Sequence, residues 1–231
     1  MNGYEIIKID DSTWRIEDAG VRFFLLTGSE RALLIDSGML VKNAKEIAES
    51  LTDLPLSLLN THADPDHING NDAFGEFYMS LSEASNYYNC MHGTGRIIPI
   101  EDGDELDLGG RLLRIISLPG HTPGSIAVLD VSNRVLISGD PIQDGNIFMF
   151  GVQRELHAYI QSLEKIKKYV SEFDYIYPSH GSFPVKPDII DPLREGALKI
   201  LNHEVQGTDI NMHGNPVKAY NVGCATFLRD K

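Results

Sequence analysis

The sequence predicts a single compact domain of the α+β class over residues 1–231, with β-sheets inside and helices outside. Short apolar runs bounded by turn residues alternate with segments of helical periodicity along the chain. No stretch rich in proline, glycine and serine is long enough to separate two domains. Hydrophobic residues make up 42% and charged residues 23% of the 231 residues, which is ordinary for a globular protein with a substantial core.

The first part of the chain is expected to begin with four consecutive strands. They cover residues 4–9, 13–18, 22–28 and 31–38. A helix is expected over 41–51, because Ala44, Ile47, Ala48 and Leu51 recur at helical spacing. A buried strand over 56–61 follows, and then a helix over 82–91 with Ser82 as its N-cap.

The second part repeats this alternation without a detectable sequence repeat. Two hairpins are expected, one around Gly109-Gly110 and one around Ser132-Asn133. The strongest helical pattern covers residues 155–173, with one apolar face formed by Leu156, Ile160, Leu163, Ile166, Lys167 and Val170. The remaining expected elements are a short strand over 175–180, a helix over 188–203, and edge strands over 217–222 and 225–230.

Charge and cysteine content exclude several classes of protein. The formal net charge of −13 argues against nucleic-acid binding, because affinity for phosphates comes mostly from Lys and Arg. No stretch approaches the ~20 apolar residues of a membrane span, and the N-terminal segment does not resemble a signal peptide, so we expect a cytoplasmic protein. Cys90 and Cys224 have no metal-type spacing. They are expected to be free thiols, with a disulfide as the alternative.

Residues of the metal-ligating type follow four of the expected strands. They are His62, Asp64, Asp66 and His67 after the strand at 56–61, His121 after "IISLPG", Asp140 after "VLISG" and His180 after "YIYPS". A single histidine after a strand is usually a hydrogen-bonded structural residue. Four histidines and three aspartates at equivalent strand ends instead favour a metal site, since function concentrates in loops at one edge of a rigid sheet.

The spacing within "HADPDH" has a physical reason. Residues two apart in an extended segment point the same way, so His62 and Asp64 can face one ion. A helix that starts at Asp66 would let Asp66 and His67 face a second ion. Two divalent ions about 3.5–4 Å apart can hold a bridging hydroxide and bind a substrate oxygen. Asp140 is the natural bridge, because a carboxylate can offer one oxygen to each ion.

In order and separation, "THADPDH", "GHTPGS", "SGD" and "PSHG" resemble the metallo-β-lactamase superfamily, from about Val21 to His180. The resemblance implies a four-layer αββα sandwich, with two mixed sheets packed face to face and helices outside. It assigns His62, Asp64 and His121 to the first ion and Asp66, His67 and His180 to the second, with Asp140 bridging. It also implies that Asp36 in "LLIDSG" supports the metal-binding loops.

Asp64 departs from the superfamily's usual H-x-H-x-D-H pattern. It can ligate the first ion directly, ligate through a water, or face solvent. As a ligand it would leave two divalent ions and three carboxylates with a formal charge of +1 rather than +2, which makes bound water less acidic. A hard oxygen ligand also shifts preference from zinc toward iron or manganese. The diiron oxygen- and nitric-oxide-reducing branch resembles this pattern, with an acidic residue at that position.

The leading interpretation is a hydrolase that uses two divalent ions on a small-molecule ester, thioester, lactone or phosphoester. Asp66 would orient the attacking water or accept its proton. The alternatives are a diiron redox protein and a non-catalytic, metal-bound sensor. No membrane partner is expected. The apolar segment 147–152 can be a pocket wall or the contact of a homodimer, and Arg154 and His157 can face substrate or lie at the surface.

Overall fold

The computed structural model describes residues 3–151 and 153–230. Its contacts divide the chain into two compact units. Unit 1 comprises Met1–Ile115 with Asp130–Ser132, and unit 2 comprises Ile116–Leu129 with Asn133–Lys231. The single domain expected over residues 1–231 stays a prediction, and we describe each unit by itself.

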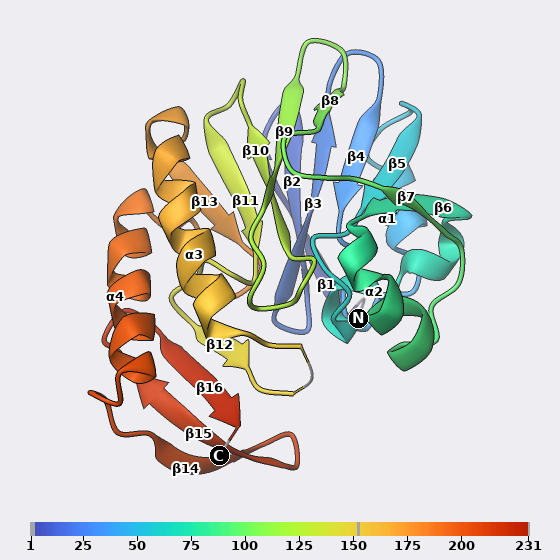
Figure 1. Cartoon of the computed structure of the whole chain (residues 1–231). Helices are drawn as coiled ribbons and strands as arrows, with labels where there is room; N and C mark the ends of the chain where they lie inside the picture. The colour runs from blue at the N-terminus through green and yellow to red at the C-terminus, as the bar shows by residue number, and fades with distance from the viewer. Residues whose placement is uncertain (1–2, 152, 231) are drawn as a thin grey trace. The chain divides into compact units, whose positions relative to one another are not determined.

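A seven-stranded mixed sheet is the framework of unit 1, and its strands follow one another in chain order (Figure 1). The strands are β1 (Tyr4–Asp10), β2 (Thr13–Asp18), β3 (Val21–Thr27), β4 (Ala32–Ile35), β5 (Leu56–Leu59), β6 (Glu76–Met79) and β7 (Arg96–Pro99). Strands β1 to β4 pair antiparallel, whereas β4 to β7 pair parallel. Because parallel strands end at the same edge, the segments that follow β4 and β5 leave the sheet side by side.

Among the described residues, two short α-helices and three further helical turns connect the parallel strands of unit 1. They are α1 (Ala44–Glu49), α2 (Pro65–Ile68), η1 (Asn71–Ala73), η2 (Leu81–Glu83) and η3 (Asn86–Cys90). Ala44 and Ile47 of α1 belong to the same buried cluster as Phe23, Leu25 and Leu34 of the sheet. The helical spacing of α1 therefore places its apolar side on the sheet, as the sequence predicts.

A hairpin of β8 (Glu105–Asp107) and β9 (Leu112–Ser117) turns at Gly109 and Gly110, as predicted. Next to this turn lies a buried ion pair of unit 1. The Arg111 guanidinium donates to Asp130 Oδ2 from Nη2 at 2.6 Å and from Nε at 2.9 Å. It also donates to the carbonyls of Ser12 and Thr27, so a single side chain joins three segments of the chain.

Unit 2 contains two groups of strands. β11 (Val135–Gly139) lies between β10 (Ile126–Asp130) and β13 (Tyr175–Pro178) and pairs parallel with β13. A four-stranded sheet comprises, in order, β12 (Asn146–Met149), β16 (Thr226–Asp230), β15 (Asn215–Asn221) and β14 (Thr208–Met212). The sequence does not predict this sheet. The two strands expected at 217–222 and 225–230 occupy its centre, so the prediction that they are edge strands is wrong.

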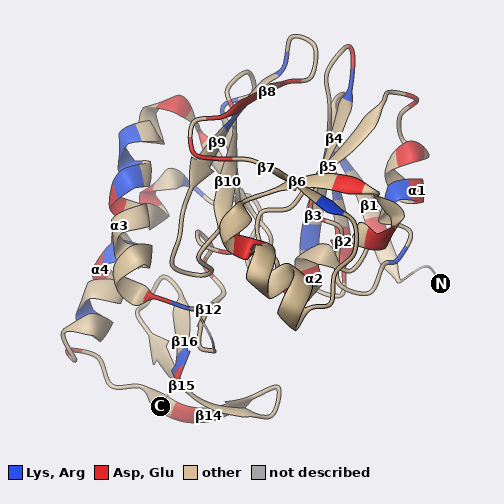
Figure 2. Ribbon diagram, turned by 45° about the vertical axis from the view of Figure 1, so that its right-hand side comes forward, with Lys and Arg blue, Asp and Glu red and all other residues tan. Residues whose placement is uncertain are grey.

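The long helices of unit 2 lie side by side in both views (Figures 1 and 2). They are α3 (Leu156–Ile166), continued by η4 (Lys167–Glu172), and α4 (Ile190–Leu201), preceded by η5 (Pro187–Ile189). Arg194 Nε to Glu164 Oε2 at 2.7 Å and Lys167 Nζ to Asp191 Oδ1 at 2.8 Å join the two helices. Figure 2 shows positively and negatively charged residues along both helices.

Two details of the helix predictions are wrong. The predicted apolar face of α3 includes Lys167, which is exposed, because the α-helical repeat ends at Ile166 and the chain tightens into η4; Tyr159 is buried instead. The segment 82–91 forms η2 and η3 rather than one helix. Its N-cap is Ser80, whose side chain accepts from Ser82 N, so Ser82 is not the cap.

Cys90 and Cys224 are free, which confirms the first of the two alternatives. Val152, the last residue of the apolar segment 147–152, lies outside the described residues. Among the helices that the structure describes, none is both long and apolar enough to cross a membrane.

Candidate metal centre

The loop after β5 carries four of the predicted ligands in unit 1. His62 lies two residues after Asn60 and is completely buried. Asp64 is extended, with φ −73° and ψ 149°, and Pro65 begins α2 directly after it. Proline at the first helical position fixes where the helix starts, so 62–64 are extended while Asp66 and His67 are helical.

The extended segment brings the first two side chains together. His62 Nε2 lies 3.5 Å from Asp64 Oδ2. Two ligands of one tetrahedral ion, each about 2.1 Å from it, are roughly 3.4 Å apart. The pair therefore has the separation that two ligands of a shared ion require.

The helical pair lies directly beside the extended pair. His67 Nε2 lies 3.7 Å from Asp66 Oδ2. The rings of His62 and His67 have centroids 4.0 Å apart at an interplanar angle of 49°. Unit 1 thus presents two imidazole nitrogens, each next to its own carboxylate.

Asp36 orients both imidazole rings. Its Oδ2 accepts from His67 Nδ1 at 2.8 Å and from the Thr61 hydroxyl at 2.7 Å, and its Oδ1 accepts from Thr61 N at 2.7 Å. The Thr61 hydroxyl, which donates to Asp36, lies 3.0 Å from His62 Nδ1 and can accept from it. Protonation at Nδ1 leaves the Nε2 lone pair of both rings for a cation.

Asp36 itself is almost completely buried and adopts φ +64°, in the left-handed region. Few residues other than glycine take this conformation, and aspartate is one of the more tolerant. The supporting role of Asp36 stays a prediction, but the contacts that it requires are present in unit 1.

Unit 2 carries the other three predicted ligands, and Asp140 lies between the two histidines. Asp140 Oδ2 is 3.5 Å from His121 Nε2, and Asp140 Oδ1 is 3.4 Å from His180 Nε2. One carboxylate oxygen is thus directed to each imidazole. This is the arrangement expected of a carboxylate that bridges two ions, each held by one of the histidines.

The His121 loop is held in place from several sides. His121 Nδ1 lies 2.8 Å from the carbonyl of Phe148, which selects Nδ1–H and leaves Nε2 facing Asp140. Arg154 donates to the carbonyl of His121, and Glu155 N donates to the carbonyl of Gly120 at 2.8 Å. Arg154 therefore supports a predicted ligand, whereas the His157 ring is exposed and contacts Glu155.

Gly120 allows this support to come so close. Its φ is +133°, and a Cβ at this position would lie against the main chain of Tyr159 in α3. The Tyr159 hydroxyl donates to the carbonyl of Pro141 at 2.8 Å, which ties α3 to the segment after Asp140 as well. Burial raises the pKa of the Tyr159 phenol well above its ordinary value, with a further contribution from Cys224, so the hydroxyl stays a donor.

Thr122 and Ser125 hydrogen bond to each other within the turn after His121, with 2.6 Å between their hydroxyl oxygens.

His92, His203 and His213 are expected to be ordinary histidines. All three lie at positive φ outside the named elements, and none belongs to the ligand-type pairs described above.

The side chains present fit divalent cations. Each of the four histidines has Nε2 within 3.4–3.7 Å of a carboxylate oxygen, and three of them are completely buried. Buried carboxylates are costly unless a cation or donors compensate them. Imidazole and carboxylate together suit zinc, iron and manganese.

Sequence reasoning missed several supports of this site. Glu83 is completely buried, and its Oε2 accepts from Ala63 N at 2.9 Å. The carbonyl of Phe148 and the side chain of Arg154 hold His121. The sequence indicates Arg154 only as a substrate contact or a surface residue, and nothing in the sequence near Glu83 or Phe148 indicates these contacts.

Comparison with known proteins places these observations in a family. The metallo-beta-lactamase superfamily profile matches residues 18–180. "Beta-lactamase-like protein 2 homolog" of Caenorhabditis elegans is 28% identical over 81% of this chain, but the match spans only 62% of that protein. "Acyl-coenzyme A thioesterase MBLAC2" of Gallus gallus is 24% identical over 72% of this chain and 75% of its own length.

A bacterial relative and a solved structure agree with this assignment. "Probable polyketide biosynthesis zinc-dependent hydrolase BaeB" of Bacillus velezensis is 30% identical over 62% of this chain and 64% of its own length. The metallo-beta-lactamase from Pontibacter korlensis superposes with a TM-score of 0.71 at 18% identity, covering 83% of this chain and 99% of that one. This structural similarity confirms the predicted α+β sandwich fold. The profile match shows that the chain belongs to the metallo-beta-lactamase superfamily.

Proposed function

We propose that this chain is a metal-dependent hydrolase that binds two divalent ions and acts on a small-molecule substrate. The observation that carries the proposal is Asp140, whose two carboxylate oxygens face His121 and His180 separately. The names of two relatives, a thioesterase and a zinc-dependent hydrolase, agree with it. Among the ester, thioester, lactone and phosphoester classes, a thioester is the first to test.

The proposed ligand sets follow the superfamily pattern. The first ion would be held by His62, Asp64 and His121 and the second by Asp66, His67 and His180, with Asp140 as a ligand available to both. Within unit 1, the 3.5 Å between His62 Nε2 and Asp64 Oδ2 supports Asp64 as a direct ligand. When bound, two such ions polarise a scissile carbonyl or phosphoryl group and lower the pKa of a bound water.

The chain's own residues supply orientation and proton transfer. Asp36 and the Phe148 carbonyl keep the protons of His67 and His121 on Nδ1, so that Nε2 is available. Asp66, with about a quarter of its side chain exposed, is the residue that we propose orients the attacking water and accepts its proton.

The second candidate is a diiron protein that reacts with oxygen or nitric oxide, and Asp64 favours it. An oxygen donor beside His62 is a harder ligand than the usual histidine and shifts preference toward iron or manganese. The third alternative, a metal-bound sensor, requires tight metal binding without turnover.

Metal analysis of the protein purified without added metal, combined with thioester and phosphodiester hydrolysis assays, tests the proposal. We expect two equivalents of divalent metal and thioester hydrolysis that is lost in Asp140→Ala and His67→Ala. His203→Ala, a change at an exposed histidine, is the matched control and should keep full activity. Iron with oxygen-dependent absorbance and no hydrolysis would favour the diiron protein. Tight metal binding with neither activity would favour the sensor.

A further inference from the structure

The main chain between two proposed ligands of the first ion is held by side chains from a different segment. Ala63 lies between His62 and Asp64 and is completely buried. Its N–H donates to Glu83 Oε2 at 2.9 Å, and its carbonyl accepts from Asn86 Nδ2 at 3.3 Å. Both main-chain groups of Ala63 are therefore fixed by residues about twenty positions further along the chain.

Glu83 is an expensive residue to place there. Its side chain is completely buried, and a glutamate is almost never fully buried unless its carboxylate has a partner. A neutral acceptor would satisfy the Ala63 N–H at a smaller desolvation cost, although hydrogen bonds to a charged group are about twice as strong as neutral ones. Glu83 thus supplies a buried acceptor for the Ala63 N–H.

The segment that supplies the two side chains is itself rigidly anchored. Ser80 caps η2 by accepting from Ser82 N, and Glu83 N donates to the Ser80 carbonyl at 3.0 Å. Tyr87, in η3, is buried and donates from its hydroxyl to the carbonyl of Thr94 at 2.7 Å. Its ring packs edge-on against Phe77 of the sheet, with centroids 5.1 Å apart.

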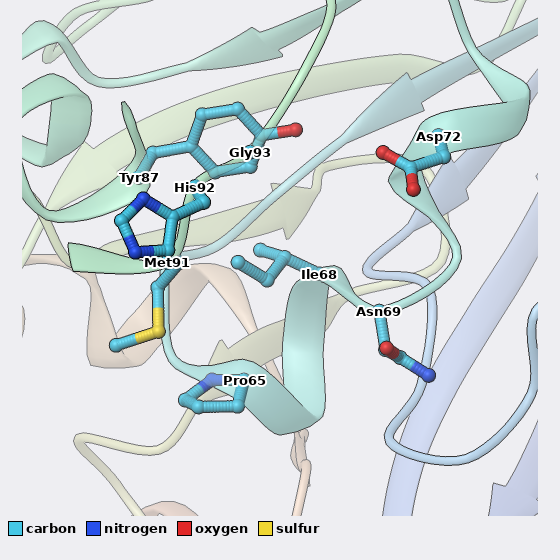
Figure 3. Close-up of a pocket in the computed structure, with 8 residues that line it drawn as sticks. All are labelled: Pro65, Ile68, Asn69, Asp72, Tyr87, Met91, His92 and Gly93. Carbon is cyan, nitrogen blue, oxygen red and sulfur yellow. The ribbon is translucent and has the colours of Figure 1, made fainter. Parts of the chain in front are cut away.

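This segment also runs next to α2, which carries Asp66 and His67. Pro65 and Ile68 of α2 line a cavity of about 160 Å³ together with Tyr87 and Met91 (Figure 3). Figure 3 shows Ile68 directed from α2 toward the side on which Met91 lies. The segment 83–93 therefore contacts Ala63 and lines one cavity with Pro65 and Ile68.

The direction of the Asp64 side chain depends on the Ala63 peptide. In an extended segment, a rotation of one peptide plane turns the next side chain away from the side chain two positions before it. Glu83 holds the N–H of the His62–Ala63 peptide and Asn86 holds the carbonyl of the Ala63–Asp64 peptide, so neither plane can rotate without losing a hydrogen bond. The 3.5 Å separation of His62 Nε2 and Asp64 Oδ2 is then maintained before an ion binds.

We propose that Glu83, assisted by Asn86, is a positioning residue that fixes the two peptide units flanking Ala63 so that His62 and Asp64 bind one ion together. This inference rests on the metal centre of the proposed function. It adds that the affinity for the first ion is set in part by a carboxylate that never contacts the ion.

Titration of the metal-free protein with Co²⁺, followed by visible absorption and by competition with a chelator, tests the inference. Glu83→Ala should lower the affinity for one of the two ions by about 10- to 100-fold, which is the usual effect of losing a residue that supports a ligand. It should also change the Co²⁺ spectrum. Glu83→Gln keeps an acceptor for the Ala63 N–H and should restore the affinity to within a few-fold. Asn86→Ala, at a half-buried position, should give a smaller loss of the same ion and remains informative if Glu83→Ala does not fold.

Asp18→Ala is the matched control. Asp18 is another buried carboxylate of unit 1, and it accepts from the main-chain N–H groups of residues 39–41, a loop without proposed ligands. It should lower the unfolding temperature without changing the affinity or spectrum of either ion. Unchanged binding of both ions in Glu83→Ala and Asn86→Ala, or an equal loss in Asp18→Ala, would overturn the inference alone. An unsubstituted protein that binds no divalent ion would overturn the proposed function with it.

Discussion

Replacing Asp36 by asparagine tests how the histidine rings are prepared for metal. Asp36 is buried and uses both oxygens as acceptors: Oδ1 from Thr61 N, and Oδ2 from the Thr61 hydroxyl and His67 Nδ1. An amide has only one acceptor oxygen. If its oxygen stays near His67, its NH₂ group faces the Thr61 N–H. If it flips, the NH₂ group faces His67 Nδ1 and forces the proton to Nε2.

The expected losses of stability and of metal affinity follow from these two outcomes. A buried donor without an acceptor costs about 1–3 kcal/mol of folding free energy. A proton on His67 Nε2 removes the lone pair needed for the second ion, and loss of a partner that orients a ligand typically costs about 10- to 100-fold in metal affinity. We therefore expect Asp36→Asn to lower the zinc affinity of one of the two metal-binding positions by at least tenfold and to lower the unfolding temperature of the metal-free protein.

Chelator competition with zinc measures the affinity, and thermal unfolding without metal measures the stability. Asp18→Asn is the control, because Asp18 accepts from Met39, Leu40 and Val41 through Oδ2 alone and Oδ1 has no hydrogen-bond partner among the described residues. An asparagine there can keep its oxygen toward the loop. Zinc affinity of Asp36→Asn within twofold of the unsubstituted protein would refute the reasoning.

Three further predictions concern the ligand at position 64, a close backbone approach and a helix cap. Asp64→His should raise zinc affinity at the first ion by about tenfold, because imidazole is a softer donor than carboxylate; unchanged affinity and metal content would show that Asp64 is not a ligand. Gly120→Ala should lower the unfolding free energy by about 3 kcal/mol, because the added Cβ clashes with α3. The control Gly20→Ala, at a glycine with positive φ but open space around it, should lower it by about 1 kcal/mol. Equal losses in denaturant unfolding would contradict this prediction. Burial opposes the shift at Glu155, but hydrogen bonds from Ala158 and His157 hold its pKa below the ordinary 4.5. Its contribution to stability is therefore present at neutral pH and is lost as the pH falls below 4.5. Glu155→Gln should thus lower the unfolding temperature at neutral pH, by an amount equivalent to about 0.5 kcal/mol, but not in acid. A difference that does not depend on pH would count against this prediction.

The elements that could be predicted are those whose signal is local. The strand Thr13–Asp18 and the turn at Gly109-Gly110 follow from alternation and glycine alone. The sequence does not predict strands β6, β7 and β12, each of which has four residues and pairs parallel with a distant segment. β14, "TDINM", alternates Ile210 and Met212 with polar residues, but over only five residues with two apolar side chains, which is a weak signal for a strand. Such strands depend on their neighbours, which a single sequence does not display.

The candidate site divides in the same way. The ligand-type residues can be found from the sequence because histidines and aspartates rarely gather at several strand ends unless they bind a metal. Their supports cannot be found in this way, because contacts such as the Phe148 carbonyl to His121 use a main-chain atom that every residue possesses. Glu83 is one acidic residue in an expected helix, and only the fold brings it to Ala63. The seven-residue ligand set and its two ions stay a prediction until metal is measured.

The way in which the main chain around position 64 is held has a consequence for how such proteins diverge. Ala63 before it is fixed by Glu83, the Asp64 carbonyl accepts from His67 N at 2.9 Å, and the Asp64 side chain makes no capping hydrogen bond to α2. The backbone geometry is thus supplied by other residues. If Asp64 binds the first ion as proposed, a single codon change at this position exchanges one metal preference for another while the fold persists. The choice of metal then evolves separately from the architecture.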